Sequence, residues 1–316
     1  MAPGSTAYPT REQITAARAL IAEHVRYTPV LQVELDGGRP VTLKLEQLQH
    51  TGSFKPRGAF HSVLSAARRP DLLVAASGGN HGLAVAHVGR SLGIGVQVFV
   101  PTTAPAVKVA RLHALGAQVH QVGDRYAEAL EASSAAAAAP GALAVHAYDG
   151  LPTVTGQGTI AAELEEQTEA DTVLVAVGGG GLVGGVASWF AGDRGIVAVE
   201  PHGCPTMHTA LAAGRPVPTT PSGVAADSLG ATVIGQVGLA ACQAAQATSV
   251  LVGDDDIARA RQWLWRTARI ASEPGGATAL AALLSGAYRP ADGERLCVIV
   301  CGANASPTDL TDVGTP

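Results

Sequence analysis

Short apolar segments alternate along the chain with longer segments in which apolar residues recur every three to four positions. The apolar segments are rich in Val, Ile and Leu and are bounded by Gly or polar residues, a pattern typical of strands buried on both faces. The predicted strands are residues 41–46, 72–76, 96–100, 118–122, 172–177, 196–199 and 296–300. Segments 83–92, 106–115 and 126–138 have helical period, and Thr10 with Gln13 predicts a capping box at an earlier helix.

This alternation predicts an α/β protein with mostly parallel sheets covered by helices on both faces. We expect two lobes. Residues 1–71 and 147–316 are predicted to form a large, discontinuous domain, and residues 72–146 a small α/β domain. No long polar linker divides the chain, so the lobes are expected to pack directly against each other.

Composition narrows the possible functions. Hydrophobic residues make up 47% of the 316 positions and charged residues 15%, which predicts a folded core. The net charge of -5, without a basic run, argues against nucleic acid or a membrane surface as a partner. The uncharged stretch 172–192 is long enough to span a membrane, but its run of four glycines favours strand, loop and helix instead. Without a signal-peptide pattern at the start, a cytoplasmic location is expected.

Three predicted strands end in polar loops that contain glycine. These loops are residues 77–82, 178–182 and 301–304. Ligands of open parallel sheets bind at the carboxyl ends of strands, and the first two loops lead into helices whose N-termini suit an anion. Each loop alone also fits a tight packing turn. Neither a P-loop nor a dinucleotide fingerprint is present, so a small phosphorylated compound is the favoured ligand.

Residues 51–59, Thr-Gly-Ser-Phe-Lys-Pro-Arg-Gly-Ala, carry the strongest chemical signal. Ser53 is expected to cap a helix that begins near Phe54, which places Lys55 in its first turn. A cation there opposes the helix dipole, and a desolvated lysine loses its proton more easily and becomes a nucleophile. The alternative is an exposed lysine whose ammonium group lies in water.

Five segments in this order resemble fold-type II pyridoxal phosphate (PLP) enzymes of the serine/threonine dehydratase branch. They are residues 53–58, 77–82, 178–182, 273–277 and 301–304, and the resemblance extends over residues 30–304. It implies pyridoxal 5'-phosphate in the cleft between two lobes, a small amino acid as substrate, and a homodimer.

The resemblance also implies roles for matching residues. Lys55 would carry the cofactor covalently and later act as base at the substrate Cα. The other cofactor contacts would be Phe54 beside the ring, Asn80 at the 3-hydroxyl, Gly178, Gly179, Gly180, Gly181 and Leu182 at the phosphate, Glu273 near the ring, and Cys301 at the pyridine nitrogen. The substrate carboxylate would bind Ser77, Gly79, Asn80 and His81.

The chain departs from the family pattern at two places. Racemases of this branch have a serine directly before Gly-Asn as a second acid/base, whereas this chain has Gly78. Relatives that bind a divalent metal place a carboxylate six residues after a glutamate, whereas Thr206 follows Glu200 here. We therefore expect neither racemisation as the main activity nor a metal.

Several residues keep two interpretations. His81 could be a helix-start residue without chemical duty, and Glu273 could end a turn before a helix. Arg57 could pair with a carbonyl or carboxylate instead of the cofactor. Asp227 and Ser228 lie in a segment that relatives use near the substrate.

The predicted function is dehydration and deamination of L-threonine and/or L-serine to a 2-oxo acid and ammonia. A neutral partner such as Cys301 at the pyridine nitrogen favours loss of the β-hydroxyl over transamination. One alternative is another β-hydroxy amino acid, such as hydroxyaspartate or phenylserine, or a β-replacement. Another is a PLP-binding protein without turnover.

Overall fold

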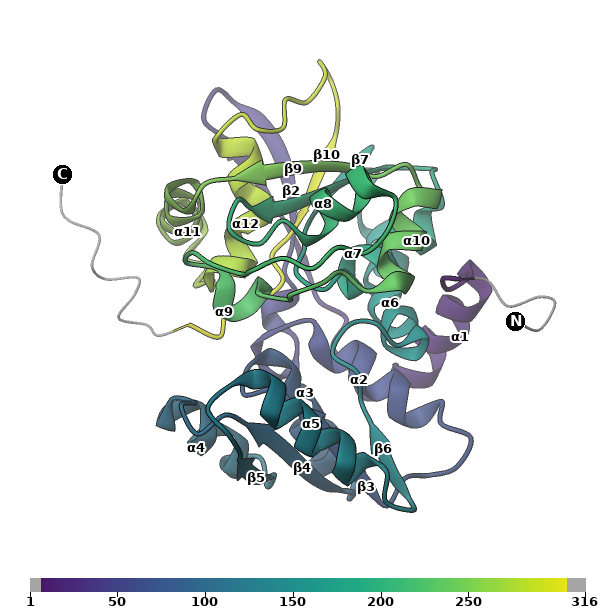
Figure 1. Ribbon diagram of the computed structural model, residues 1–316. Helices are drawn as coiled ribbons and strands as arrows, with labels where there is room; N and C mark the ends of the chain where they lie inside the picture. The colour runs from purple at the N-terminus through teal and green to yellow at the C-terminus, as the bar shows by residue number, and fades with distance from the viewer. Residues whose placement is uncertain (1–6, 306–316) are drawn as a thin grey trace.

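The computed structural model describes residues 7–305, in which the chain builds two sheets (Figure 1). The six-stranded sheet is parallel except for the antiparallel pair β1–β2. Its order is β1 (Val30–Leu35), β2 (Arg39–Lys44), β10 (Leu296–Ile299), β7 (Thr172–Ala176), β8 (Gly195–Pro201) and β9 (Thr248–Val252). The four-stranded sheet is parallel throughout, in the order β5 (Gln118–Gln121), β4 (Gly95–Val100), β3 (Leu72–Ala76) and β6 (Ala142–Ala144).

Helices cover both sheets. On the six-stranded sheet, α12 is backed by α11, and α7 is backed by α6 and α10, while every residue of β7 is buried. On the four-stranded sheet, α3 and α5 both pack on β3 and β4. The helices are α1 (Arg11–Ile21), α2 (Lys55–Leu64), α3 (Asn80–Leu92), α4 (Ala106–Ala114), α5 (Tyr126–Ala137), α6 (Leu151–Gln167), α7 (Gly181–Phe190), α8 (Thr206–Ala213), α9 (Ala226–Leu229), α10 (Gln236–Ala244), α11 (Asp254–Ala268) and α12 (Pro274–Leu284), with short 3-10 turns η1 (Glu46–Leu48) and η2 (His50–Gly52).

The predicted α/β class is confirmed, and each of the seven predicted strands is present with small shifts at its ends. Strands β1, β6 and β9 were not predicted. β6 has three residues, and β1 and β9 are sheet edges whose side chains are largely exposed or half-buried, so their apolar pattern is weak. The capping box at Thr10 and Gln13 is present.

The two sheets have separate apolar cores, and α2 packs on one side against the core of the four-stranded sheet and on the other side against α6. Ala59, Phe60 and Val63 of α2, with Ile21 of α1, pack in the core of the four-stranded sheet. The opposite side of α2 packs on α6. The domain boundaries at residues 71/72 and 146/147 stay a prediction. Within residues 7–305, we find no helix with the length and apolar character that crossing a bilayer requires.

Candidate active site

The three glycine-containing loops converge at the carboxyl ends of β3, β7 and β10. A cavity of about 430 Å³ lies there, lined by Lys55 and by the loop between β3 and α3. A narrow cavity of about 40 Å³ adjoins it, lined by the glycine loop after β7 and by Cys301 after β10. Both cavities share Lys55, Asn80, Tyr148, Gly179, Ser228 and Leu229, so they form one continuous site.

Lys55 is the first residue of α2 and lines both cavities. Its Nζ donates a hydrogen bond to the carbonyl oxygen of Ala147 at 2.8 Å. Burial lowers the pKa of Lys55 to about 8, although Cys301 and Glu273 nearby act in the opposite direction. The alternative of an amine in water is therefore wrong, and the lowered pKa gives this amine a far larger neutral fraction near pH 7 than an ordinary lysine has.

The expected Ser53 cap is wrong. Phe54 is the N-cap of α2, and the Ser53 hydroxyl is buried without a hydrogen-bond partner in residues 7–305. The reason is that Ser53 forms a β-bridge with Gly302, while the Phe54 N–H donates to the Cys301 carbonyl at 3.2 Å. The segment before Lys55 is thus fixed to the loop after β10 by its backbone.

The glycine loop after β7 leads directly into α7, as predicted. Gly180 has a φ of 88°, a conformation that favours glycine. A Cβ on Gly179 would lie 2.2 Å from the Tyr148 ring, so only glycine fits at this position. The first N–H groups of α7 have no acceptor within the helix and lie at its positive end, which suits a phosphate.

Asn80 begins α3 and connects the loops after β3 and β10. Its Nδ2 donates to Glu273 Oε1 at 2.6 Å, and its Oδ1 accepts from Asn304 Nδ2 at 2.6 Å. Glu273 is the N-cap residue of α12, as the structural interpretation predicted, and it also lines the narrow cavity. Burial raises the pKa of Glu273 to about 6, against the lowering effect of the Asn80 bond.

The loop from Ser77 to His81 lines the larger cavity. The Gly79 N–H donates to Ser77 Oγ at 3.2 Å, which shapes the turn. His81 lies at the start of α3, and its Nε2 is 2.7 Å from the Val145 carbonyl oxygen. Burial, with the nearby Lys55, lowers the pKa of His81 to about 3, so the ring is neutral and Nε2 donates to that carbonyl.

Cys301 lies in the wall of the narrow cavity, near Phe54 and Lys55. Its side chain is buried, and burial raises the pKa of the thiol to about 12. The Sγ is 3.5 Å from the Gly275 carbonyl oxygen. Cys301 is therefore a neutral thiol. Cys297 on the same strand lies in the apolar core, as expected.

Among the cavity residues that the sequence did not predict as site residues, four have polar side chains close to Lys55 or Asn80 in the lining: Tyr148, Lys108, Asp227 and Ser228. Tyr148 lines both cavities from the segment that joins β6 to α6, and Lys108 of α4 lines the larger one. Asp227 and Ser228 of α9 also line the larger cavity, which supports the interpretation that placed them near the substrate. Tyr148 and Lys108 belong to no glycine loop, so no motif in the sequence marks them.

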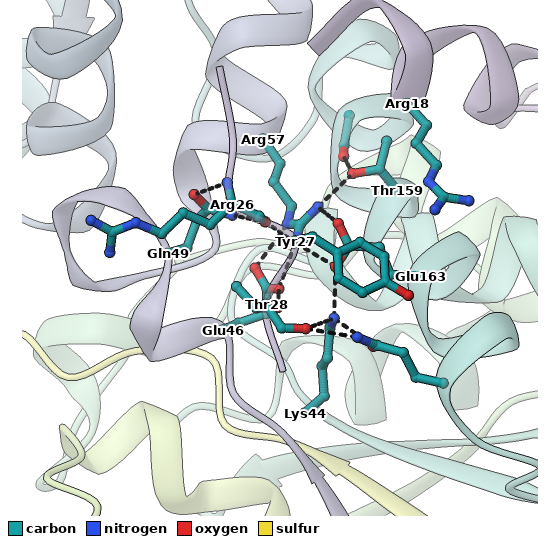
Figure 2. Close-up of polar contacts among 12 residues, drawn as sticks. Arg18, Arg26, Tyr27, Thr28, Lys44, Glu46, Gln49, Arg57, Thr159 and Glu163 are labelled. Atoms are coloured by element: carbon teal, nitrogen blue, oxygen red, sulfur yellow. Dashed lines mark hydrogen bonds and ion pairs between the residues drawn. The ribbon is translucent and has the colours of Figure 1, made fainter. Parts of the chain in front are cut away.

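Arg57, two residues after Lys55, is fully buried and bound by carboxylates, as one interpretation predicted (Figure 2). Its guanidinium donates to Glu46 at 2.8 and 2.9 Å and to Glu163 of α6 at 2.7 and 2.9 Å. Lys44 of β2 donates to the same Glu163 at 2.6 Å. Residues i and i+2 of a helix point in nearly opposite directions, so this buried cluster holds the side of α2 that lies away from the cavity.

The Glu200 side chain has a structural role at the start of α8. Its two carboxylate oxygens accept hydrogen bonds from the N–H groups of Met207 and His208 at 2.7 and 2.8 Å, and from the Thr206 hydroxyl at 3.0 Å. The carboxylate thus caps the start of α8. In residues 7–305, no cluster of three His, Cys, Asp or Glu side chains has the geometry of a metal site.

These features fit PLP. The partly neutral Lys55 amine suits attachment to an aldehyde, and the start of α7 suits a phosphate. The narrow cavity between them has the neutral Cys301 thiol in its wall.

The chain matches the family "Pyridoxal-phosphate dependent enzyme" over residues 21–302. It is 34% identical to phenylserine dehydratase of Ralstonia pickettii over 95% of this chain and 94% of that protein. It is 33% identical to L-threonine ammonia-lyase of Thermotoga maritima over 88% of this chain and 70% of that protein. The structure of maize serine racemase superimposes with a TM-score of 0.90 and 30% identity, covering 97% of this chain and 96% of that one. The chain therefore belongs to the pyridoxal-phosphate dependent enzyme family, and its cofactor is pyridoxal phosphate.

Proposed function

We propose that this protein is a dehydratase that converts L-threonine and/or L-serine to the 2-oxo acid and ammonia. The observation that carries the proposal is the position of Lys55. Its amine, with a pKa lowered to about 8, lies in the wall shared by the narrow cavity and the larger one. A single amine can therefore hold a cofactor that fills the narrow cavity and extends into the larger one, and can reach a substrate in the larger cavity.

The proposed cofactor contacts follow the narrow cavity. Lys55 would hold PLP covalently, Phe54 would lie beside the ring, Asn80 would bind the 3-hydroxyl, and Glu273 would lie near the ring. The backbone N–H groups of the loop after β7 hold the phosphate, from Gly178, Gly179, Gly180, Gly181 and Leu182. Cys301 faces the pyridine nitrogen as a neutral thiol. All of these residues line the narrow cavity, which supports the assignment.

The substrate is proposed to bind in the larger cavity. Ser77, Gly79, Asn80 and His81 bind its carboxylate at the start of α3, where the helix dipole favours an anion. PLP, when bound, would supply the electron sink that makes the Cα proton acidic. The substrate amine would take the place of Lys55 on the cofactor, and the freed, neutral amine of Lys55 would then remove the Cα proton. Such assisted transfers contribute about 10²–10⁴-fold to the rate. Loss of the β-hydroxyl as water would leave an enamine, which hydrolyses to the 2-oxo acid and ammonia.

Gly78 supports elimination over racemisation. Racemisation needs a second group that returns a proton to Cα from the face opposite Lys55. Gly78 lines the larger cavity at the position that the racemases fill with serine, and it has no side chain that could do this.

Two measurements test the proposal together. Purified protein supplied with PLP should release 2-oxobutyrate from threonine or pyruvate from serine. Borohydride reduction followed by peptide mapping should find the pyridoxyl group on Lys55, and Lys55→Ala should lose both the adduct and the activity. An adduct on another residue would refute the assignment, and an adduct on Lys55 without product from either amino acid would refute the substrates.

A second candidate substrate is an aromatic β-hydroxy amino acid such as phenylserine. The observation that favours it is the apolar part of the wall of the larger cavity, formed by Val100, Pro101, Ala104, Pro105, Tyr126 and Tyr148. A wall of this composition suits a phenyl group better than a methyl group or hydrogen. Comparison of kcat/KM for phenylserine, threonine and serine decides between the two candidates. The highest value for phenylserine would favour the aromatic substrate, and the highest value for threonine or serine would favour the first proposal.

We also propose that the protein is a homodimer, as the family resemblance implies and as is commonest among soluble oligomers. Light scattering on the eluting protein measures its mass directly. A mass of 31.8 kDa, that of one chain, would contradict this proposal.

A further inference from the structure

An ion pair crosses the larger cavity between the two sheet regions. Lys108 lies on α4, which follows β4 of the four-stranded sheet. Asp227 lies on α9, in the segment between β8 and β9 of the six-stranded sheet. In Figure 1, α9 lies on the side of its region that faces the four-stranded sheet. The Lys108 ammonium pairs with the Asp227 carboxylate, and both residues line the cavity that contains Lys55.

A second contact holds α4 in this position. Arg111 follows Lys108 by three residues and so lies on the same face of the helix. Its guanidinium donates to Asn304 Oδ1, and Asn304 in turn donates to Asn80 at 2.6 Å. Lys108, Asp227, Arg111 and Asn304 all line a small pocket beside Asn80. The orientation of Lys108 toward the cavity is therefore supported by a neighbouring contact on the same helix face.

The charges of Lys108 and Asp227 cancel each other in the wall of the larger cavity. Besides Lys55 and the neutral His81, the acidic and basic side chains lining the larger cavity, within residues 7–305, are Lys108 and Asp227. Lys108 is 27% exposed and Asp227 is 70% exposed, so Asp227 is the member nearer solvent. The remaining wall combines apolar side chains with uncharged polar ones such as Ser77, Thr103 and Thr232. A second carboxylate on the substrate would therefore find no unpaired cation there to offset its loss of water, which is unfavourable.

We propose that the Lys108–Asp227 pair determines substrate specificity by excluding β-hydroxy amino acids that carry a second carboxylate, the hydroxyaspartate class. Asp227 neutralises the cation that such a substrate would need, and its own carboxylate repels the incoming anion. Neutral side chains meet neither penalty. This inference rests on the proposed dehydratase function and deepens it by assigning the side-chain class.

Removing the negative member of the pair tests the proposal. Asp227→Asn keeps the shape and leaves Lys108 free. The ratio of kcat/KM for β-hydroxyaspartate to that for threonine should rise by about fivefold, which corresponds to about 1 kcal/mol, the upper range for a partly exposed ion pair. The double variant Lys108→Met/Asp227→Asn should lose this gain, because no cation remains. The matched control is Glu169→Gln, which removes a carboxylate from the exposed pair with Arg295 before β7, at the opposite end of the strands from the cavity.

A binding measurement separates failure of this inference from failure of the proposed reaction. Calorimetry on the PLP-loaded protein compares succinate, a dicarboxylate, with butyrate, a monocarboxylate of similar length. Asp227→Asn should tighten succinate binding about fivefold relative to butyrate, whether or not any hydroxy amino acid is turned over. An unchanged ratio, or a gain that persists in the double variant, would overturn the role of the pair. A gain in succinate affinity without 2-oxo acid production would support the pair and refute the dehydratase reaction.

Discussion

The buried cluster behind Lys55 allows a quantitative prediction for Glu163→Gln. Lys44 and Arg57 are cations, Glu46 and Glu163 are carboxylates, and the four charges balance with almost no exposure to water. Glutamine has nearly the shape of glutamate but no charge. The substitution therefore leaves two buried cations with one carboxylate, and we expect a large loss in the free energy of unfolding.

The magnitude follows from the distances. Glu163 lies 2.6 Å from Lys44 Nζ and 2.7 Å from Arg57 Nη1. At an effective dielectric constant of about 20, each attraction is about 6 kcal/mol before the cost of removing the charges from water. Breaking one partner of a buried pair costs about 3–5 kcal/mol net, because the desolvation cost of the remaining charges is no longer offset. For a chain of 316 residues this corresponds to a fall in Tm of about 5–8 °C.

Urea and thermal unfolding measure the effect, and the same helix supplies the control. Glu165 pairs with Arg11 at the surface, where the two side chains are 37% and 43% exposed. Glu165→Gln should cost less than about 1 kcal/mol. If Glu163→Gln destabilises the protein no more than Glu165→Gln does, the cluster does not stabilise the fold in the way that its burial indicates.

Three further predictions concern the site. The rate at which PLP attaches to cofactor-free protein should rise with pH with a midpoint near 8, because the neutral Lys55 amine is the nucleophile. Stopped-flow absorbance measures this rate, and a midpoint near 10.5, the ordinary pKa of lysine, would contradict the prediction. Cys301→Ser should keep most of the activity, whereas Cys301→Asp should increase transamination, seen as pyridoxamine phosphate by chromatography; equal products from both variants would refute the neutral-partner argument. EDTA should leave the rate unchanged because Glu200 caps α8, and a loss restored by Mg²⁺ would show that a metal binds there.

How well the sequence predicts the structure differs from element to element. The strands β2, β3, β4, β5, β7, β8 and β10 were predictable because continuous apolar runs are a local signal. The edge strands β1 and β9 were not, because partial exposure removes that signal. The Ser53 cap failed because a bridge to Gly302, almost 250 positions away, decides where α2 begins.

For the site, the sequence alone determined the lysine in a helix's first turn, the glycine loop before α7 and the neutral residue after β10. Each depends on neighbours within a few positions, so it is encoded locally. Tertiary structure alone decided that Tyr148 lines both cavities, that Lys108 meets Asp227 and that Arg57 lies between two carboxylates. These contacts join segments distant in the chain, and their burial and charge balance exist only once folding brings those segments together.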